Sequence, residues 1–144
     1  MDIDAVQYVT DLEQIRSLTQ RYARAIDARD IDAVGALFHP EANVEGMRGA
    51  APIDAYLEGL RNGASPYTAS MHVLGDPLVS FTPGSDEAAT DTYAVVYQLH
   101  EPGSGENDLT LGMRYFDQLA RYAGGWVITH RRATNLWMRD ERRA

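Results

Sequence analysis

The chain has 144 residues, a length typical of one globular domain that can bury a core without disulfides. It contains neither cysteine nor lysine, which excludes thiolate catalysis, Schiff bases and a phosphate-binding P-loop lysine. The net charge of −8 disfavours a nucleic-acid partner, and no apolar run is long enough to cross a bilayer. No secretory signal is visible, so we expect a cytoplasmic protein with a single domain over residues 1–144.

The first half of the chain has helical periodicity. Thr10 and Glu13 match a capping box, which predicts a helix from Asp11 to about Ala28 after a loose lead-in over residues 1–10. Further signals predict a short helix capped by Asp30 and ended by Pro40, a strand over residues 42–45, and a helix that begins at Pro52 and stops near Gly63.

After Pro66 the apolar period changes from helical to two, and glycine-rich and proline-rich turns separate the segments. This pattern predicts strands over residues 67–74, 77–82, 90–100, 109–121 and 126–138. Helices followed by a meander of long strands indicate the α+β class. We therefore expect the helices to pack on the concave face of a curved antiparallel sheet.

One predicted strand carries a large apolar face, formed by Tyr93, Val95, Tyr97 and Leu99. If its opposite face lines a pocket, this stripe lies outside. Exposed apolar surfaces of that size are normally covered by a partner, so we expect a homo-oligomer, a dimer or a trimer. The alternative is that a loop or the C-terminal segment covers the stripe.

Four segments resemble the SnoaL-like members of the NTF2-like superfamily: residues 21–30, 36–44, 71–75 and 124–132. The resemblance extends over nearly the whole chain. It implies a cystatin-like cone, in which N-terminal helices lie on the concave face of a curved mixed or antiparallel sheet that encloses an apolar pocket. The same fold serves enzymes and non-catalytic binders, so the fold alone does not define the function.

Three residues resemble the catalytic pattern of scytalone dehydratase and bile-acid 7α-dehydratase: Tyr22 and Asp27 near the end of the first long helix, and His72 on the first long strand. By the same resemblance, Arg131 and Asn135 face the pocket and bind substrate, and so does His100, which lies beside a Gly/Pro turn and fits a surface loop equally well. From spacing alone, Tyr22 also fits a structural core position and Asp27 a surface or capping position. His72 lies on a polar strand face, which is usually a solvent face; only the resemblance turns it inward.

The sequence leaves other pocket positions open. Strand alternation favours neither Arg131 nor Arg132, and the resemblance selects Arg131. On the strand over residues 109–121, either Met113 and Tyr115 or Arg114 and Phe116 face the pocket. The base carboxylate of ketosteroid isomerases falls at Gly46, which argues against their mechanism. Asp117 is the candidate for the second carboxylate that an epoxide hydrolase of this fold would need.

An imidazole oriented by a carboxylate can accept and return a proton near neutral pH, and a tyrosine hydroxyl can stabilise developing negative charge. These parts suit elimination of water, enolisation or aldol-type cyclisation. We therefore expect a lyase or isomerase without cofactor or metal, acting on a small apolar oxygenated molecule such as a polyketide, steroid-like or aromatic intermediate. The alternative is a non-catalytic ligand-binding or oligomerisation module of the same fold.

Overall fold

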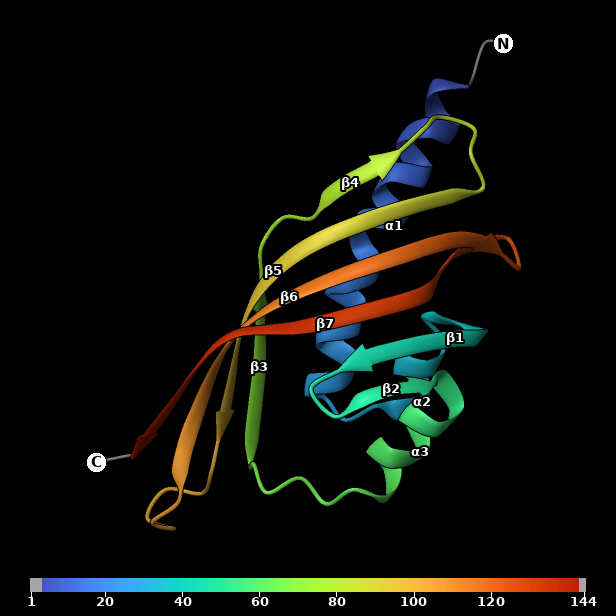
Figure 1. Ribbon diagram of the computed structural model, residues 1–144. Helices are drawn as coiled ribbons and strands as arrows, with labels where there is room; N and C mark the ends of the chain where they lie inside the picture. Colours follow the sequence, from blue (N-terminus) through green and yellow to red (C-terminus); the bar gives the residue numbers. More distant parts are fainter. Residues whose placement is uncertain (1–3, 143–144) are drawn as a thin grey trace.

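The computed structural model describes residues 4–142 and shows helices packed on one face of a curved sheet (Figure 1). The helices are α1 (Ala5–Asp27), α2 (Ile31–Gly35) and α3 (Ile53–Asn62). The strands are β1 (Phe38–Gly46), β2 (Gly49–Pro52), β3 (Ala69–Leu74), β4 (Leu78–Phe81), β5 (Glu87–Leu99), β6 (Asn107–Tyr122) and β7 (Gly125–Arg142). The expected α+β arrangement is confirmed.

The sheet has seven strands in the order β2-β1-β7-β6-β5-β3, with β4 also paired to β5. All pairs are antiparallel except β1 and β7, which run parallel. The sheet is therefore mixed rather than purely antiparallel. The short strand β2 was not predicted, because Gly-Ala-Ala-Pro contains no β-branched or aromatic residue.

The predicted start of the first helix is wrong. Helix α1 begins at Ala5, where the side chain of Asp4 accepts a hydrogen bond from the backbone N–H of Val6 at 2.9 Å. Thr10 is not a cap but donates its hydroxyl hydrogen to the carbonyl of Val6, one turn earlier, at 2.7 Å. The lead-in expected over residues 1–10 is thus helical from residue 5, and residues 1–3 lie outside the described part.

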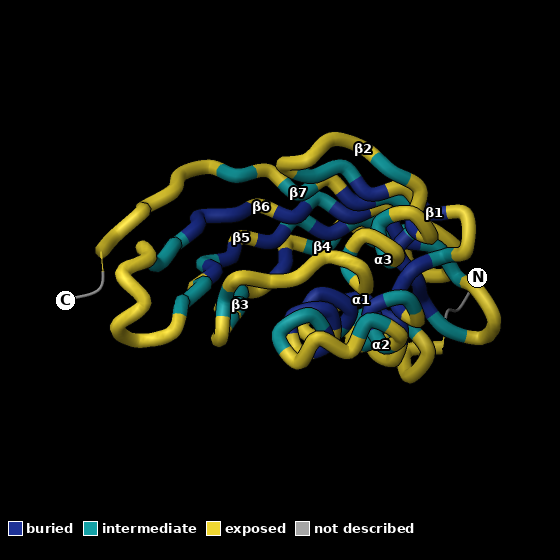
Figure 2. Tube along the Cα trace, turned by 90° about the horizontal axis from the view of Figure 1, so that it is seen from below, coloured by how far each residue is buried: buried dark blue, intermediate teal, exposed yellow. Residues whose placement is uncertain are grey.

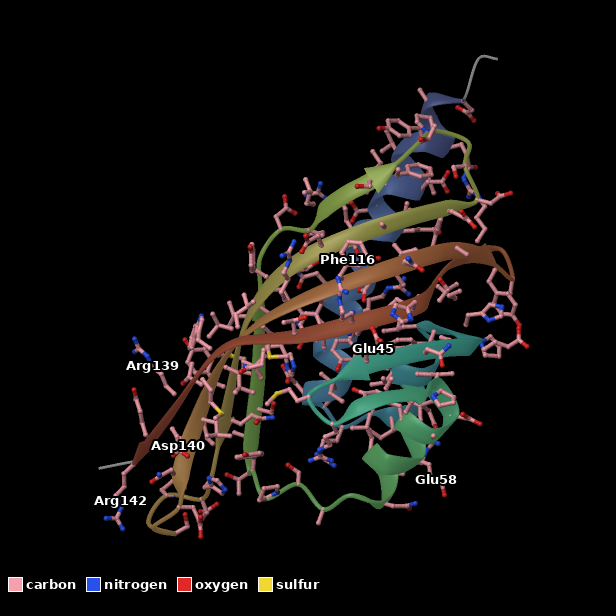
Figure 3. All side chains as sticks on the ribbon, in the orientation of Figure 1. Glu45, Glu58, Phe116, Arg139, Asp140 and Arg142 are labelled. Atoms are coloured by element: carbon pink, nitrogen blue, oxygen red, sulfur yellow. The ribbon has the colours of Figure 1, made fainter. Side chains whose placement is uncertain are left out.

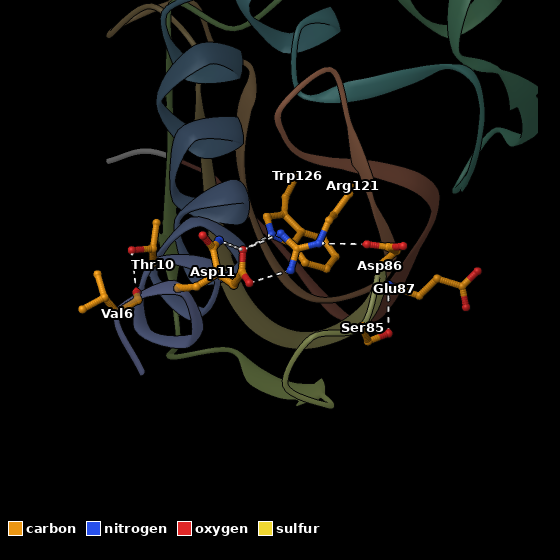
Figure 4. Close-up of polar contacts among 9 residues, drawn as sticks. Val6, Thr10, Asp11, Ser85, Asp86, Glu87, Arg121 and Trp126 are labelled. Carbon is orange, nitrogen blue, oxygen red and sulfur yellow. Dashed lines mark hydrogen bonds and ion pairs between the residues drawn. The ribbon is translucent and has the colours of Figure 1, made fainter. Parts of the chain in front are cut away.

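Tertiary contacts explain why the helix extends further toward the N-terminus than its sequence pattern suggests. The ring of Tyr8 stacks on that of Phe81 with centroids 5.9 Å apart. The carboxylate of Asp11 is buried and accepts hydrogen bonds from Arg121 and Trp126 on the β6–β7 hairpin (Figure 4). Packing of this kind stabilises a helix more than local propensity does.

The caps predicted for the other two helices are confirmed, but the predicted end of the second helix and start of the first strand are wrong, since α2 stops at Gly35 and β1 begins at Phe38. Asp30 caps α2, since its carboxylate accepts the backbone N–H of Ala33 at 3.1 Å. The helix ends at Gly35, before Pro40, which lies in β1. Helix α3 has Pro52 as its N-cap and Gly63 as its C-cap.

The core lies between the helices and the concave face of the sheet (Figure 2). Strand β5 shows the division: Ala94 and Val96 are buried, whereas Tyr93 and Tyr97 on the opposite side are 62% and 38% exposed. The expectation that this stripe lies outside is confirmed for its two tyrosines. In Figure 3 the labelled Phe116 and Glu45 mark the same outer face.

Candidate active site

Two elements bring the predicted catalytic residues together. Helix α1 carries Tyr22 in its buried stripe and Asp27 as its last residue. Strand β3 runs beside this end of the helix and carries Ser70 and His72 on its inner side. The polar face of β3 therefore points toward the helix rather than to solvent.

The carboxylate of Asp27 holds His72 in one orientation. Its Oδ1 lies 2.7 Å from Nδ1 of the imidazole, and its Oδ2 accepts the backbone N–H of the same histidine at 2.8 Å. The hydroxyl of Ser70 donates to Oδ1 at 3.3 Å. A carboxylate partner places the ring proton on Nδ1, so Nε2 is left as the proton acceptor.

The imidazole is almost fully enclosed: the side chain of His72 is 8% exposed, and that of Asp27 is 21% exposed. Burial lowers the pKa of His72 below its ordinary value, and the hydrogen bond and charge of Asp27 offset part of this effect. The positive charge of Arg131 acts in the same direction as burial. The histidine is therefore neutral, and able to act as a base, at neutral pH.

Two tyrosines meet beside this pair. The ring of Tyr22 stands edge-on to the imidazole of His72 with centroids 6.1 Å apart, and its hydroxyl lies 3.2 Å from that of Tyr56 on α3. Burial raises the pKa of Tyr56, so its phenol stays protonated. Sequence reasoning missed Tyr56, because it occupies a core position in the apolar stripe of α3 and nothing in that pattern distinguishes it.

Arg131 on β7 is a fully buried charged residue of the site and packs against Tyr22. Its Nε and Nη2 donate to the two oxygens of Asp117 on β6 at 2.8 and 2.7 Å. The guanidinium carbon lies 4.1 Å from the ring centre of Tyr22 and 4.7 Å from that of Tyr115. Within residues 4–142, its buried Nη1 has no hydrogen-bond partner. Burial opposes the charge, but the carboxylate of Asp117 more than compensates and raises the pKa of Arg131.

A model of the SnoaL-like domain matches residues 7–132, which is most of the chain. The chain belongs to the SnoaL-like family. This confirms the family resemblance inferred from the sequence, and the NTF2-like fold with it. A search of curated proteins found no match.

Solved structures share the fold of this SnoaL-like domain. A hexachlorocyclohexane dehydrochlorinase, LinA type 2, is similar with a TM-score of 0.82 and 13% identity, covering 95% of this chain and 93% of its own. A proposed scytalone dehydratase from Novosphingobium aromaticivorans has a TM-score of 0.79 and 19% identity, covering 98% and 94%. An NTF2-like protein with a cystatin-like fold, from the same species, has a TM-score of 0.71 and 21% identity, covering 91% and 85%.

The register of the sheet settles the position that the sequence left open on β6. Met113 and Tyr115 pair with the inward residues Ala94 and Thr92 of β5 and are buried. Their neighbours Arg114 and Phe116 point to the outer face, where Arg114 forms an ion pair with Asp91. The inner face of the SnoaL-like sheet is thus lined by Met113 and Tyr115.

The two remaining predicted substrate-binding residues lie farther along the strands. His100 follows β5; its backbone N–H donates to Asp108 at 2.7 Å, and its ring lies 4.7 Å from that of Tyr67. Asn135 on β7 pairs with Met113, and its amide donates to the carbonyl of Trp137 at 3.0 Å. A substrate contact at either residue stays a prediction.

Residues 4–142 of this SnoaL-like domain hold neither a metal-binding cluster nor a helix that could span a membrane. No group of three or more histidine, aspartate or glutamate side chains is arranged so that it could hold a metal ion. Among the same residues, none of the helices combines the length and the apolar character that a membrane span requires.

Proposed function

We propose that this SnoaL-like domain is a lyase or isomerase that works without a cofactor on a small apolar oxygenated molecule. The observation that carries the proposal is the part-buried hydrogen bond between Asp27 and His72. In this reading His72 is the acid and base, Asp27 orients it, and Tyr22 is the hydrogen-bond donor to the substrate.

The geometry suits proton abstraction next to a carbonyl. Nε2 of His72 takes a proton from carbon, and the imidazolium that forms is stabilised by Asp27. The electron pair moves to the carbonyl oxygen as an enolate develops. In an isomerisation, the proton returns to another carbon; in a dehydration, the C–O bond breaks and the proton leaves with the hydroxyl as water.

The developing enolate needs a donor, and the two hydroxyls of Tyr22 and Tyr56 supply one. Their mutual hydrogen bond at 3.2 Å uses one hydroxyl hydrogen and leaves the other for the substrate. Donors held in a dry site stabilise a transition-state oxyanion more than they would in water. Tyr56 therefore joins Tyr22 as a member of the proposed site.

Two structural relatives support elimination chemistry, since one is named a dehydrochlorinase and the other a proposed dehydratase. The epoxide-hydrolase alternative has less support, because each oxygen of Asp117 already accepts one hydrogen bond from Arg131. A non-catalytic ligand-binding module stays the alternative, and a cytoplasmic location stays a prediction.

Deuterium exchange tests the proposal without knowledge of the natural substrate. A panel of neutral cyclic ketones and β-hydroxyketones is incubated with the protein in D₂O and followed by NMR. We expect exchange at the carbon next to the carbonyl, or loss of the β-hydroxyl, at least about a hundredfold above the rate with His72→Gln. Equal rates for the wild type and His72→Gln across the whole panel would contradict the proposal and favour the non-catalytic ligand-binding module.

We further propose that the outer face of the sheet binds a second copy of the chain. It carries a groove of about 360 Å³ lined in part by Val73, Tyr93, Leu136 and Trp137, and all four side chains are well exposed. The indole of Trp137 packs against Gly112, where a Cβ atom would lie 2.2 Å from the ring. Apolar surface of this extent on one sheet face is typical of an interface.

Light scattering after size exclusion tests this surface. The wild type is expected to run as a dimer or trimer of the 16.0 kDa chain. Tyr93→Glu and Leu136→Glu place a charge in the groove and should shift the mass to that of a monomer. Val6→Glu, on the exposed side of α1 and away from the groove, is the matched control. A wild-type monomer would contradict the proposal.

A further inference from the structure

The charges enclosed at the proposed site do not favour an anion. From α1 comes the carboxylate of Asp27, from β6 the carboxylate of Asp117, and from β7 the guanidinium of Arg131. Burial lowers the pKa of His72, which is therefore neutral at neutral pH, and burial raises the pKa of Tyr56 and Tyr115. The enclosed side chains therefore carry one more negative charge than positive.

The positive charge of Arg131 is already compensated. Its bidentate pair with Asp117 has both side chains buried, at 2% and 1% exposure, so that solvent does not screen the two groups from one another. The two hydrogen bonds of a bidentate Arg–carboxylate pair are charge-assisted and strong, and the two charges of the pair cancel. A ligand that approaches Arg131 meets an ion pair with no net charge rather than an isolated cation.

One part of Arg131 still has binding capacity. Nη1 carries two N–H groups, is buried, and has no partner within residues 4–142. The guanidinium lies against the ring of Tyr22, which also contacts His72, Tyr56 and Tyr115. A buried donor without a partner is costly, so something is expected to accept its hydrogen bonds.

We infer that the group bound between His72 and Arg131 is an uncharged oxygen, a carbonyl or a hydroxyl, and that the site rejects carboxylates and phosphates. The inference rests on the proposed function and names its substrate class. A carbonyl oxygen accepts from Nη1 or a tyrosine hydroxyl at no cost in buried charge. A carboxylate would lose its hydration beside Asp27 without gaining a counter-ion.

The competing account is that Nη1 binds a structural water. The hydroxyls of Thr19 on α1 and Thr92 on β5 are also buried and without partners among the described residues. A water shared with these hydroxyls would satisfy Nη1 and leave Arg131 with no contact to a ligand. In that case the site would show no charge selectivity that depends on the Arg131–Asp117 pair.

Binding of two probes of equal shape tests the inference. Benzamide and benzoate are titrated at pH 7.5 into protein with ¹⁵N-labelled histidine, and the His72 signal is assigned by its loss in His72→Gln. We expect benzamide to bind at least tenfold more tightly than benzoate. Asp117→Asn frees the charge of Arg131 and should reverse the preference. Because binding is measured and not turnover, the result is independent of whether the site is catalytic.

A second variant covers the case in which Asp117→Asn does not fold. Asp27 is less buried than Asp117, and Asp27→Asn removes the uncompensated negative charge of the site. In this variant, the ratio of the dissociation constant of benzoate to that of benzamide should be at least fivefold smaller than in the wild type. Tighter or equal binding of benzoate to the wild type, no response to benzamide, or an unchanged preference in the folded variants would each overturn the inference.

Discussion

Replacement of His72 by Gln is expected to abolish most of the turnover, by a factor of about 10² to 10⁴, because the proton acceptor is lost. Asp27→Asn should cause a loss of similar size. An amide cannot stabilise the imidazolium, and it leaves the ring free to adopt the wrong tautomer, since the 2.7 Å contact at Nδ1 fixes the present one. The measurement is kcat on the ketone that shows the fastest exchange.

Matched variants on the outer face separate chemistry from folding. His130 contacts Glu45 at 3.2 Å, and Asp91 pairs with Arg114, both on the side of the sheet turned away from α1. His130→Gln and Asp91→Asn should keep kcat within about twofold of the wild type. If the two site variants fold with the wild-type circular dichroism spectrum and remain as active as these controls, the assignment of His72 and Asp27 fails.

Much of this site could be anticipated from the sequence, but not from local pattern alone. The capping of α2 by Asp30 and the strand alternation of β5 follow from neighbours in the chain. The inward orientation of His72 does not, because a polar strand face usually faces water and only the family resemblance turned it inward. The structure gives the physical reason: the end of α1 presents a carboxylate to this face.

What the sequence could not provide is pairing across the sheet. The contact of Arg131 with Asp117 depends on the register of β6 and β7, which is shifted by bulges near Gly112 and Gln118. A register change of one residue would have turned Arg132 inward instead. Tyr56 reaches Tyr22 only because α3 packs beside β1, a tertiary relation with no signature in the helix itself.

The second large effect is expected at Asp11, far from the proposed site. Its carboxylate is 2% exposed and accepts two hydrogen bonds from Arg121 at 2.7 and 2.6 Å and one from Trp126 at 3.0 Å (Figure 4). The guanidinium of Arg121 also lies 4.6 Å from the ring centre of Trp126. This cluster joins the first turns of α1 to the β6–β7 hairpin.

Asp11→Asn should lower the free energy of unfolding by about 3 kcal/mol, at the lower end of the range for breaking a buried ion pair because Arg121 is partly exposed. Urea denaturation measures this change. Asp86 provides the control, since it also contacts Arg121, at 3.1 Å, but is 83% exposed. Asp86→Asn should cost less than about 0.5 kcal/mol.

The difference in the free energy of unfolding between the wild type and Asp11→Asn should also depend on pH, which gives a second test. The hydrogen bond from Arg121, opposed by burial, lowers the pKa of Asp11 from 3.8 to about 2. When the pKa of a carboxyl group is lower in the folded protein than in the unfolded protein, the group stabilises the folded state. This stabilisation is complete at pH values above the unfolded pKa, and it is lost as the pH falls through the folded pKa. The gap between wild type and Asp11→Asn should therefore be constant from pH 5 to 8 and shrink by about 2 kcal/mol between pH 4 and 2. A gap of the same size at both ends of the acid range would mean that Asp11 acts through packing and not through its charge.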